Sequence, residues 1–422
     1  MQINKIKIDN FKGISSIEFR PKKINLIVGR NNTGKTSVLE AINLLFDHEN
    51  ILQMYDKHLS DIIYTGAEYS EIVVEMNKNK KKLRISKPDK SEVIYQFRKD
   101  ISEAFIRALS KFFTRINLPE NTIDIEEIKH KSENKIDEAI TPEIINILSK
   151  KSVSLLKDDK DKIVRCYLPF SEYSRISRIL RSMLPGILEQ ISKSKTWVTN
   201  KSLDKEMVLS SIIPEIFEML IFGQLFKISE GKDAVLIKNL LDVKFESEEK
   251  DAKMKRKIRN IESLIKEYNL IENLERLDFD YVTFKDKDEK LTYIPFEFLG
   301  DGFKVITGLL WHLSSPNIKN KIVLLDEPEM HMHPGYIKEL VKFIIEFSRN
   351  TNIQFFISTH SIDIIDIFLD VDIFSKEYRE YLEKELLVLR MDKIGDQNLS
   401  EWLNYEEAKN TKGELLLDLR GI

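Results

Sequence analysis

The fold is decided by GRNNTGKTS, the stretch from Gly29 to Ser37. Its glycines, Gly29 and Gly34, stand five positions apart and precede a lysine and a threonine, which is the full P-loop pattern. Glycines let backbone N–H groups curve around a phosphate, and the helix that follows points its positive dipole end at it. The pattern therefore predicts a phosphate-binding loop made of Gly29, Arg30, Asn31, Asn32, Thr33, Gly34, Lys35, Thr36 and Ser37.

The segments on either side of the loop have the context that a P-loop requires. KINLIVG, ending at Gly29, is a nearly continuous apolar run, as expected of a strand buried on both faces of a parallel sheet. TSVLEAINLLF, from Thr36 to Phe46, has its apolar residues at helical spacing. We expect Lys35 to reach the β- and γ-phosphates of ATP, and the Thr36 hydroxyl to ligate Mg²⁺. A chance match in a glycine turn is the alternative, and this context disfavours it.

Two more buried strands are predicted near the carboxyl end of the chain, and each ends in residues that carry chemistry. In KIVLLDEPE the apolar run is followed by Asp326 and Glu327, and NIQFFISTH ends in His360, with an amphipathic helix over 335–350 between them. Open α/β sheets bind ligands at the carboxyl ends of their strands. We expect Asp326 to be the second Mg²⁺ partner and Glu327 to orient and deprotonate the attacking water. If its strand lies beside the P-loop strand, His360 is placed to hydrogen-bond the γ-phosphate.

Each of these assignments has a structural alternative. Asp326 and Glu327 could cap a helix that has Pro328 at its first position, and His360 could be an ordinary polar residue at a strand end. His331 and His333 could form a metal pair with Glu327 or Glu329, but the two histidines point apart if the segment is helical, and no third ligand is evident.

The rest of the chain predicts an α/β head interrupted by a mainly helical insertion. INKIKI and ISSIEF predict an amino-terminal hairpin, SEIVVEM and KKLRIS a second one with EVIYQF (92–97) as its third strand, and 280–296 another. Between about 101 and 280 the composition favours helices, with one strand near 162–170. Met254, Ile258, Ile261, Ile265 and Tyr268 are spaced to line one helix face. We therefore expect a discontinuous head over 1–98 and 281–422 and an insertion over 99–280.

The composition limits the classes of partner. The 66 basic and 69 acidic side chains nearly cancel, so any nucleic-acid contact must come from a local patch. The best patch is the basic run 77–87, which either binds DNA phosphates or is a solvated lysine-rich turn, and 250–260 has the same ambiguity. Cys166 is the only cysteine, which excludes an intramolecular disulfide and fits a reducing compartment. No secretion signal or membrane span is evident, so we expect a cytoplasmic protein with no membrane contact.

Four motifs together carry a family resemblance. GRNNTGKTS, LGDGF (299–303), LLDEPEMHMHP (324–334) and STHS (358–361) occur in the order of Walker A, signature, Walker B with D-loop, and switch histidine. In this order the chain resembles ABC-type ATPase heads of the SMC/RecF/OLD branch, and most closely the OLD-like ATPase subunits of prokaryotic antiphage systems. The resemblance covers about the first 100 and the last 140 residues.

The resemblance implies a homodimer in which ATP is sandwiched between the Walker A loop of one head and the signature of the other. The signature residues are Gly300, Asp301 and Gly302, which precede a helix and so offer backbone N–H donors. Gly300 departs from the pattern, since a serine is usual there, and a simple glycine turn is the alternative. No glutamine joining the two lobes can be assigned, although Gln53 and Gln96 are candidates by position. Phe11 and Lys12 match a segment that lies near the nucleotide in related heads.

The resemblance also implies a function. About sixty residues follow His360, too few for the nuclease module of full OLD proteins. We expect an ATPase switch that gates a separate effector, a nuclease or a toxin, in antiphage defence. A RecF- or SMC-like ATPase that binds DNA directly in repair or tethering is the alternative, and a scaffold with a vestigial nucleotide site is a third reading.

Overall fold

The computed structural model describes most of the chain. The described residues are 2–48, 51–55, 59, 61–77, 79–115, 142–150, 152–166, 185, 205–221, 233–238, 240, 252–278, 280–314, 318, 321–330, 332–370, 375–394 and 397–413. They form two compact units. The first unit contains Met1–Phe46, Ile72–Lys81 and Gly231–Ile422, and the second contains Asp47–Glu71 and Lys82–Glu230. No described helix is both long and apolar enough to cross a bilayer.

The first unit is built on a six-stranded sheet of order β15-β14-β3-β13-β12-β8. Its strands are β3 (Ile24–Gly29), β8 (Ala234–Ile237), β12 (Ile322–Asp326), β13 (Gln354–Thr359), β14 (Leu386–Ile394) and β15 (Gln397–Asn404). All neighbours pair in parallel except β14 and β15, which are antiparallel. Every residue of β3 and β13 is buried, as their continuous apolar sequences predict. The expected adjacency of the P-loop strand and the strand before His360 is confirmed.

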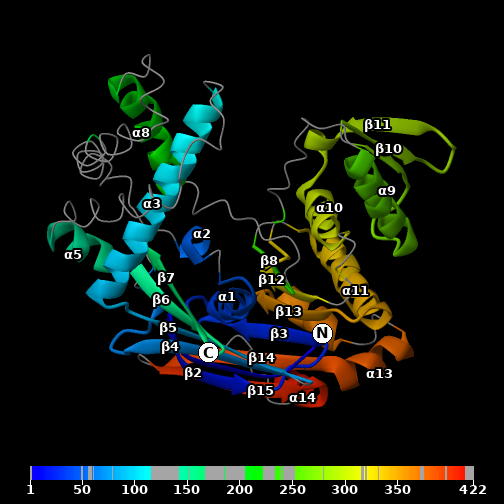
Figure 1. The fold of residues 1–422 in the computed structure, drawn as a ribbon. Helices are drawn as coiled ribbons and strands as arrows, with labels where there is room; N and C mark the ends of the chain where they lie inside the picture. The colour runs from blue at the N-terminus through cyan, green and yellow to red at the C-terminus, as the bar shows by residue number, and fades with distance from the viewer. Residues whose placement is uncertain are drawn as a thin grey trace. The chain divides into compact units, whose positions relative to one another are not determined.

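Helices surround this sheet and complete its core. They are α1 (Lys35–Phe46), α9 (Ala252–Glu267), α10 (Asp301–Leu313), α11 (Pro334–Asn350), α12 (Ile362–Leu369), α13 (Lys376–Glu385) and α14 (Tyr405–Gly413), with the 3₁₀ turn η5 (Phe296–Phe298) before α10. α1 packs on β3, β13, β12 and β8, while α11 contacts α12 and α13 (Figure 1). The predicted helix over 335–350 is confirmed as α11, whose apolar stripe is buried.

The first unit contains two further sheet segments. β1 (Ile3–Phe11) and β2 (Ile14–Phe19) form the predicted antiparallel hairpin, and β4 (Tyr69–Met76), which belongs to this unit from Ile72 on, lies next to β1. Gln354 at the start of β13 is fully buried and ties this hairpin to the central sheet. Its side-chain oxygen accepts a hydrogen bond from the backbone N–H of Ile3 at 2.8 Å, and its amide donates to the carbonyls of Ile3 and Lys22 at 3.0 and 2.8 Å.

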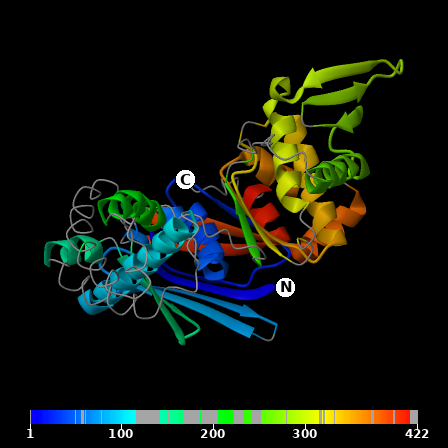
Figure 2. The same ribbon diagram turned by 45° about the horizontal axis from the view of Figure 1, so that its top comes forward.

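A small antiparallel sheet of order β11-β10-β9 lies with α9 in the same unit. Its strands are β9 (Leu274–Leu277), β10 (Tyr281–Lys285) and β11 (Leu291–Pro295), so the predicted hairpin over 280–296 is confirmed. The predicted helix face is confirmed for Ile258, Ile261 and Ile265 of α9, and Tyr268 just after the helix is buried too, whereas Met254 is only partly buried. The ring of Tyr268 meets the ring of Phe343 in α11 edge to face, with centroids 5.2 Å apart. Figures 1 and 2 both show this sheet, in yellow-green, beside α9 and α10.

The second unit is largely helical. It contains α2 (Ile51–Tyr55), α3 (Lys90–Arg115), α5 (Pro142–Lys150), α8 (Lys205–Ile221) and the strands β6 (Ser152–Lys157) and β7 (Asp161–Cys166). β5 (Asn79–Ser86) begins in the first unit and continues into the second, where it pairs with β6, and β6 pairs with β7. α3 packs on α5 and α8.

The prediction of a strand at 92–97 is wrong, because these residues lie in α3. Asp89 and Glu92 form a capping box: Asp89 Oδ1 accepts from the Glu92 N–H at 2.8 Å, and Glu92 Oε2 accepts from the Asp89 N–H at 3.1 Å. Val93, Phe97 and Ile101 are then buried at helical spacing. The D-x-x-E signal was present in the sequence, and it outweighs the short apolar alternation that favours a strand.

Residues 231–280 were expected in the insertion, but they belong to the first unit. These residues belong with the head, because β8 pairs with β12 and α9 packs on α10. The strand expected near 162–170 is described only as far as β7, which belongs to the second unit and pairs with β6. Residues 47–71 and 82–98, expected in the head, also belong to the second unit.

Candidate functional site

The P-loop runs from the end of β3 into the first turn of α1. Gly29 and Gly34 have φ angles of 152° and 100°, which favour glycine. A Cβ atom at Gly29 would lie 2.2 Å from the carbonyl oxygen of Met391 in β14, so no larger residue fits there. The Thr33 hydroxyl donates to the Arg30 carbonyl at 2.9 Å and closes the loop. Asn31 and Asn32 are exposed on it, while Ser37 is buried in α1.

Lys35 lies inside this loop with only 5% of its surface exposed. Its Nζ donates to the carbonyls of Gly29 at 2.9 Å and Arg30 at 2.8 Å. Burial lowers the pKa of Lys35, and the nearby carboxylates, with Glu327 and Asp326 foremost, act in the opposite direction. The ammonium is therefore held by neutral carbonyls, and phosphate oxygens are stronger acceptors that can replace them.

The tips of β12 and β13 meet the loop. The Thr36 hydroxyl donates to Asp326 Oδ1 at 2.9 Å, and the Ser358 hydroxyl donates to the same oxygen at 2.5 Å. The Thr36–Asp326 contact joins residues 290 positions apart in the sequence, and the Ser358–Asp326 contact joins residues 32 apart. The parallel pairing of β3, β13 and β12 produces this convergence, because it brings their carboxyl ends to one edge of the sheet.

Glu327 follows Asp326 in an unusual backbone conformation, with φ of 49°. Its N–H donates to the Ser358 carbonyl at 3.0 Å, and its carbonyl accepts from the Met330 N–H at 3.1 Å. Its Oε1 lies 3.1 Å from His360 Nδ1. A left-handed conformation is uncommon in residues other than glycine and is found most often at functional sites. The turn places the Glu327 carboxylate against His360.

The helix-cap alternative for Asp326 and Glu327 is wrong. The next helix, α11, begins at Pro334, and its N-cap is His333, whose Nδ1 accepts from the Gly335 N–H at 3.3 Å. His333 is thus used in capping, and His331 lies outside the described residues. Among the residues that are described, no group of three or more His, Cys, Asp or Glu side chains is arranged to hold a metal ion.

Glu329 is a buried residue of this site, and the sequence indicated no role for it other than a metal pair with His331 and His333. It is 7% exposed, and its Oε1 accepts a hydrogen bond from the Thr359 hydroxyl, which itself accepts from the Ser361 N–H at 3.0 Å. Burial raises the pKa of Glu329, more than the Thr359 hydrogen bond lowers it. Glu329 therefore links the turn after β12 to the loop that carries His360. The sequence signal that could have identified this residue is the second glutamate of DEPE, which is Glu329 itself.

The signature residues precede α10. Gly300 is the N-cap, and its carbonyl accepts from the N–H groups of Phe303 and Lys304 at 3.1 and 3.3 Å. Asp301 is the first residue of the helix. Gly302 packs on Tyr336 of α11, where a Cβ atom would lie 2.6 Å from the ring. The structure thus unites the P-loop, Asp326, Glu327 and His360, whereas the signature loop contacts α11.

The remaining candidates have other contacts. Lys12 donates through Nζ to Glu40 Oε2 at 2.6 Å, and Gln96 donates to Asp100 within α3 at 2.8 Å. The side chain of Gln53 lies outside the described residues. Neither Gln53 nor Gln96 is supported as a nucleotide contact.

Several side chains of the basic run 77–87 have intramolecular partners. Lys82 lies 3.2 Å from both Glu71 and Asp159, and Lys81 lies 3.2 Å from Asp233. Residue 78 is outside the described part. The ion pairs of Lys81 and Lys82 favour a structural role for these two side chains over binding of DNA phosphates.

Comparisons with known proteins identify the family of the chain. A model of the AAA ATPase domain family matches residues 1–365. The chain belongs to this family. An ATP/GTP phosphatase of Helicobacter pylori is 24% identical over 412 residues, covering 92% of this chain and 93% of that protein. An uncharacterized protein of Methanocaldococcus jannaschii is 29% identical over 123 residues, which are 29% of this chain and the whole of that protein.

Two further likenesses concern the SMC/RecF branch. The DNA replication and repair protein RecF of Francisella tularensis is 37% identical over 95 residues, which span 21% of this chain and 27% of RecF. Among solved structures, the SMC head domain from Thermotoga maritima aligns with 96% of this chain and 99% of its own, with a TM-score of 0.42 and 12% identity. Family membership identifies the chain as an ATPase.

Proposed function

We propose that the chain is a Mg²⁺-dependent ATPase that works as a nucleotide-controlled switch. The observation that carries this proposal is the convergence of Lys35, the Thr36–Asp326 pair and the Glu327–His360 pair at one sheet edge. The donor set fits the metal, because a hydroxyl and a carboxylate 2.9 Å apart are the oxygen ligands that Mg²⁺ prefers in P-loop enzymes. Bound there, the ion would neutralise charge on the phosphates.

The chain's own residues account for the rest of the chemistry. Lys35 exchanges the carbonyls of Gly29 and Arg30 for phosphate oxygens. Glu327 takes a proton from a water whose oxygen attacks the γ-phosphorus, while the bond to the bridging oxygen breaks and ADP leaves. His360 holds the Glu327 carboxylate through its Nδ1, which leaves its Nε2 as the ring atom that would hydrogen-bond the γ-phosphate.

We further propose that two copies of the chain sandwich ATP, with Gly300, Asp301 and Gly302 of one copy facing the P-loop of the other. The N-terminus of α10 offers free backbone N–H groups in its first turn. No atom would lie within 4 Å of a Cβ at Gly300, so the loop leaves room for a phosphate group.

The switch would gate a separate effector, a nuclease or toxin, in prokaryotic antiphage defence of the OLD type. The alternative is an ATPase that binds DNA itself, and the RecF match favours it. DNA binding that weakens steeply with salt, and weakens further when Lys80 to Lys82 are neutralised, would favour the alternative. A flat salt dependence would count against it.

Glu327→Gln tests the catalytic part of the proposal. Loss of the general base should lower ATP turnover by about 10²–10⁴-fold, because an amide cannot accept the proton. ATP binding should persist, and ATP should then drive dimerisation that is visible by sedimentation. Lys35→Ala is the contrasting variant, since it should lose ATP binding itself. Near-normal hydrolysis by Glu327→Gln would remove Glu327 from the mechanism.

A further inference from the structure

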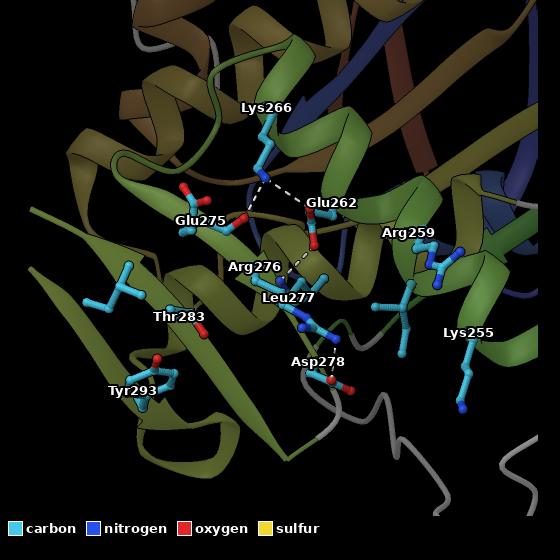
Figure 3. Close-up of a pocket in the computed structure, with 12 residues that line it drawn as sticks. Lys255, Arg259, Glu262, Lys266, Glu275, Arg276, Leu277, Asp278, Thr283 and Tyr293 are labelled. Carbon is cyan, nitrogen blue, oxygen red and sulfur yellow. Dashed lines mark hydrogen bonds and ion pairs between the residues drawn. The ribbon is translucent and has the colours of Figure 1, made fainter. Parts of the chain in front are cut away.

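A polar groove lies between α9 and the small sheet, entirely within the first unit. Its volume is about 830 Å³, within the range of sites that bind ligands. One wall is a stripe on α9 at helical spacing, formed by Lys255, Arg259, Glu262 and Lys266. Figure 3 shows Glu262 and Lys266 turned toward the sheet, with Arg259 and Lys255 farther along the same helix. From Lys255 to Lys266 the wall is about 16 Å long, which matches about five residues of extended polypeptide.

The floor of the groove is the outer face of the sheet. Arg276 of β9 pairs in register with Thr283 of β10, and Thr283 pairs with Tyr293 of β11. Since these three positions stand opposite one another across the strands, their side chains form one row on the same face. Leu291 lies two residues before Tyr293 on that face. The floor is thus cationic on β9 and apolar on β11.

Near β11, large apolar side chains are unusually exposed. Tyr281, Leu291, Tyr293 and Phe298 are all large and exposed, and they come from a segment of only eighteen residues. β11 is also an edge strand of its sheet, and the segment 291–295 has no lysine to protect that edge. Natural proteins usually cover or charge such edges, and exposed apolar patches of this kind mark interaction sites.

The charges in the groove are unequally satisfied. Glu262 accepts from Lys266 Nζ at 2.9 Å and from the Leu277 N–H at 2.9 Å, and Arg276 lies 3.6 Å from Asp278. Lys255 and Arg259, one turn apart on α9, have no ion-pair partner among the described residues. Their ammonium and guanidinium groups are free to bind carboxylates at that end of the groove.

We propose that this groove docks an extended acidic and apolar segment of a partner protein. Carboxylates of the segment bind Lys255 and Arg259, and an apolar side chain packs on Tyr293 and Leu291. A nucleic-acid strand fits less well, because Glu262, Glu275 and Asp278 also line the groove and repel a polyanion along its length. Tyrosine and arginine, here Tyr293 and Arg259, are enriched at protein–protein interfaces.

The test selects random peptides of about twelve residues, displayed on phage, against the immobilised full chain. Selected peptides are then synthesised with a fluorescent label, and their binding to the full chain is measured by anisotropy. They should contain Asp or Glu together with a large apolar residue. Arg259→Glu should weaken their binding at least tenfold, and Tyr293→Ala about tenfold.

Two matched controls separate docking from general effects. Arg256 is exposed on the same helix but does not line the groove, so Arg256→Glu makes the same charge change. Tyr95→Ala is the control for Tyr293→Ala, because Tyr95 lies in the second unit and has the same 63% exposure as Tyr293. Both control variants should bind the peptides within about twofold of the wild type, since neither side chain contacts the groove. ATP turnover should be unchanged in Arg259→Glu, which shows that the head is intact.

Three results would overturn the proposal. The first is a failure of the peptide test itself: either no peptide is enriched, or the Arg259→Glu variant binds the selected peptides as well as the wild type does. The second is that oligo-dT of about 20 nucleotides binds in their place and is lost in the groove variants, which would make the groove a nucleic-acid site. The third is that the groove variants change self-association of the chain while peptides do not bind, which would make it an interface between copies.

Discussion

The carboxyl of Glu40 gives the sharpest test of the energetics around the nucleotide site. Glu40 is buried in α1, and its two oxygens accept hydrogen bonds from Lys12 Nζ, at 2.6 Å, and from Lys238 Nζ. Lys12 belongs to the turn between β1 and β2, and Lys238 follows β8. One carboxylate therefore ties the P-loop helix to two other elements of the first unit, and Glu40→Gln removes its charge without changing its shape.

The expected magnitude follows from the two contacts. A hydrogen bond between charged groups contributes about 1.5–3 kcal/mol, and the lysines are a third to a half exposed, so solvent screens part of it. We expect Glu40→Gln to lower the free energy of unfolding by about 1.5–3 kcal/mol at pH 7. Glu18→Gln is the control, since Glu18 pairs with Lys5 at 2.7 Å on the surface and should cost less than about 1 kcal/mol.

The pH dependence has a defined sign. Burial favours the neutral acid, but the hydrogen bonds from Lys12 and Lys238 outweigh it and lower the pKa of Glu40 below its ordinary 4.5. In the unfolded chain the carboxyl takes up its proton at the higher pH. The stabilisation is therefore complete above pH 4.5 and is lost as the pH falls through the folded pKa. The difference in stability between wild type and Glu40→Gln should shrink on acidification.

Urea unfolding, followed by tryptophan fluorescence between pH 7 and about pH 3.5, measures this difference. Three results would refute the reasoning: a difference that stays constant over the whole pH range, a difference that grows on acidification, or a loss at pH 7 no larger than that of Glu18→Gln.

Two further predictions concern packing. Gly302→Ala places a Cβ 2.6 Å from the Tyr336 ring and should lower the unfolding midpoint by an amount equivalent to about 0.5–2 kcal/mol. Gly300→Ala is the control, because its Cβ meets no atom within 4 Å and the unfolding midpoint should stay unchanged. Equal midpoints for the two variants would contradict this prediction. Gln354→Leu leaves the buried N–H and C=O of Ile3 without the hydrogen bonds that Gln354 supplies. It should lower the free energy of unfolding by about 2–4 kcal/mol in the same assay. A loss below about 0.5 kcal/mol would show that these backbone groups find other partners.

Much of the site could be predicted from the sequence because its signals are local. A glycine pattern between an apolar run and an amphipathic helix specifies a P-loop at Gly29 to Ser37, and carboxylates after an apolar run specify the tip of β12. The rule that parallel strands present their carboxyl ends at one edge then predicts that Lys35, Glu327 and His360 converge. In the structure the Thr36–Asp326 and Glu327–His360 contacts bring these strand ends together.

Other features were decided only by tertiary structure, because they depend on which distant segments become neighbours. Gly29 must be glycine not only for its φ angle but because Met391 of β14 lies against it, and nothing in the loop sequence predicts that neighbour. The stretch 231–280 reads as part of a helical insertion, yet β8 and α9 complete the head through pairing with β12 and packing on α10. Local sequence determines which elements form and what their ends can bind. The pairing of strands hundreds of residues apart is set by burial of the whole core, and no short segment specifies it.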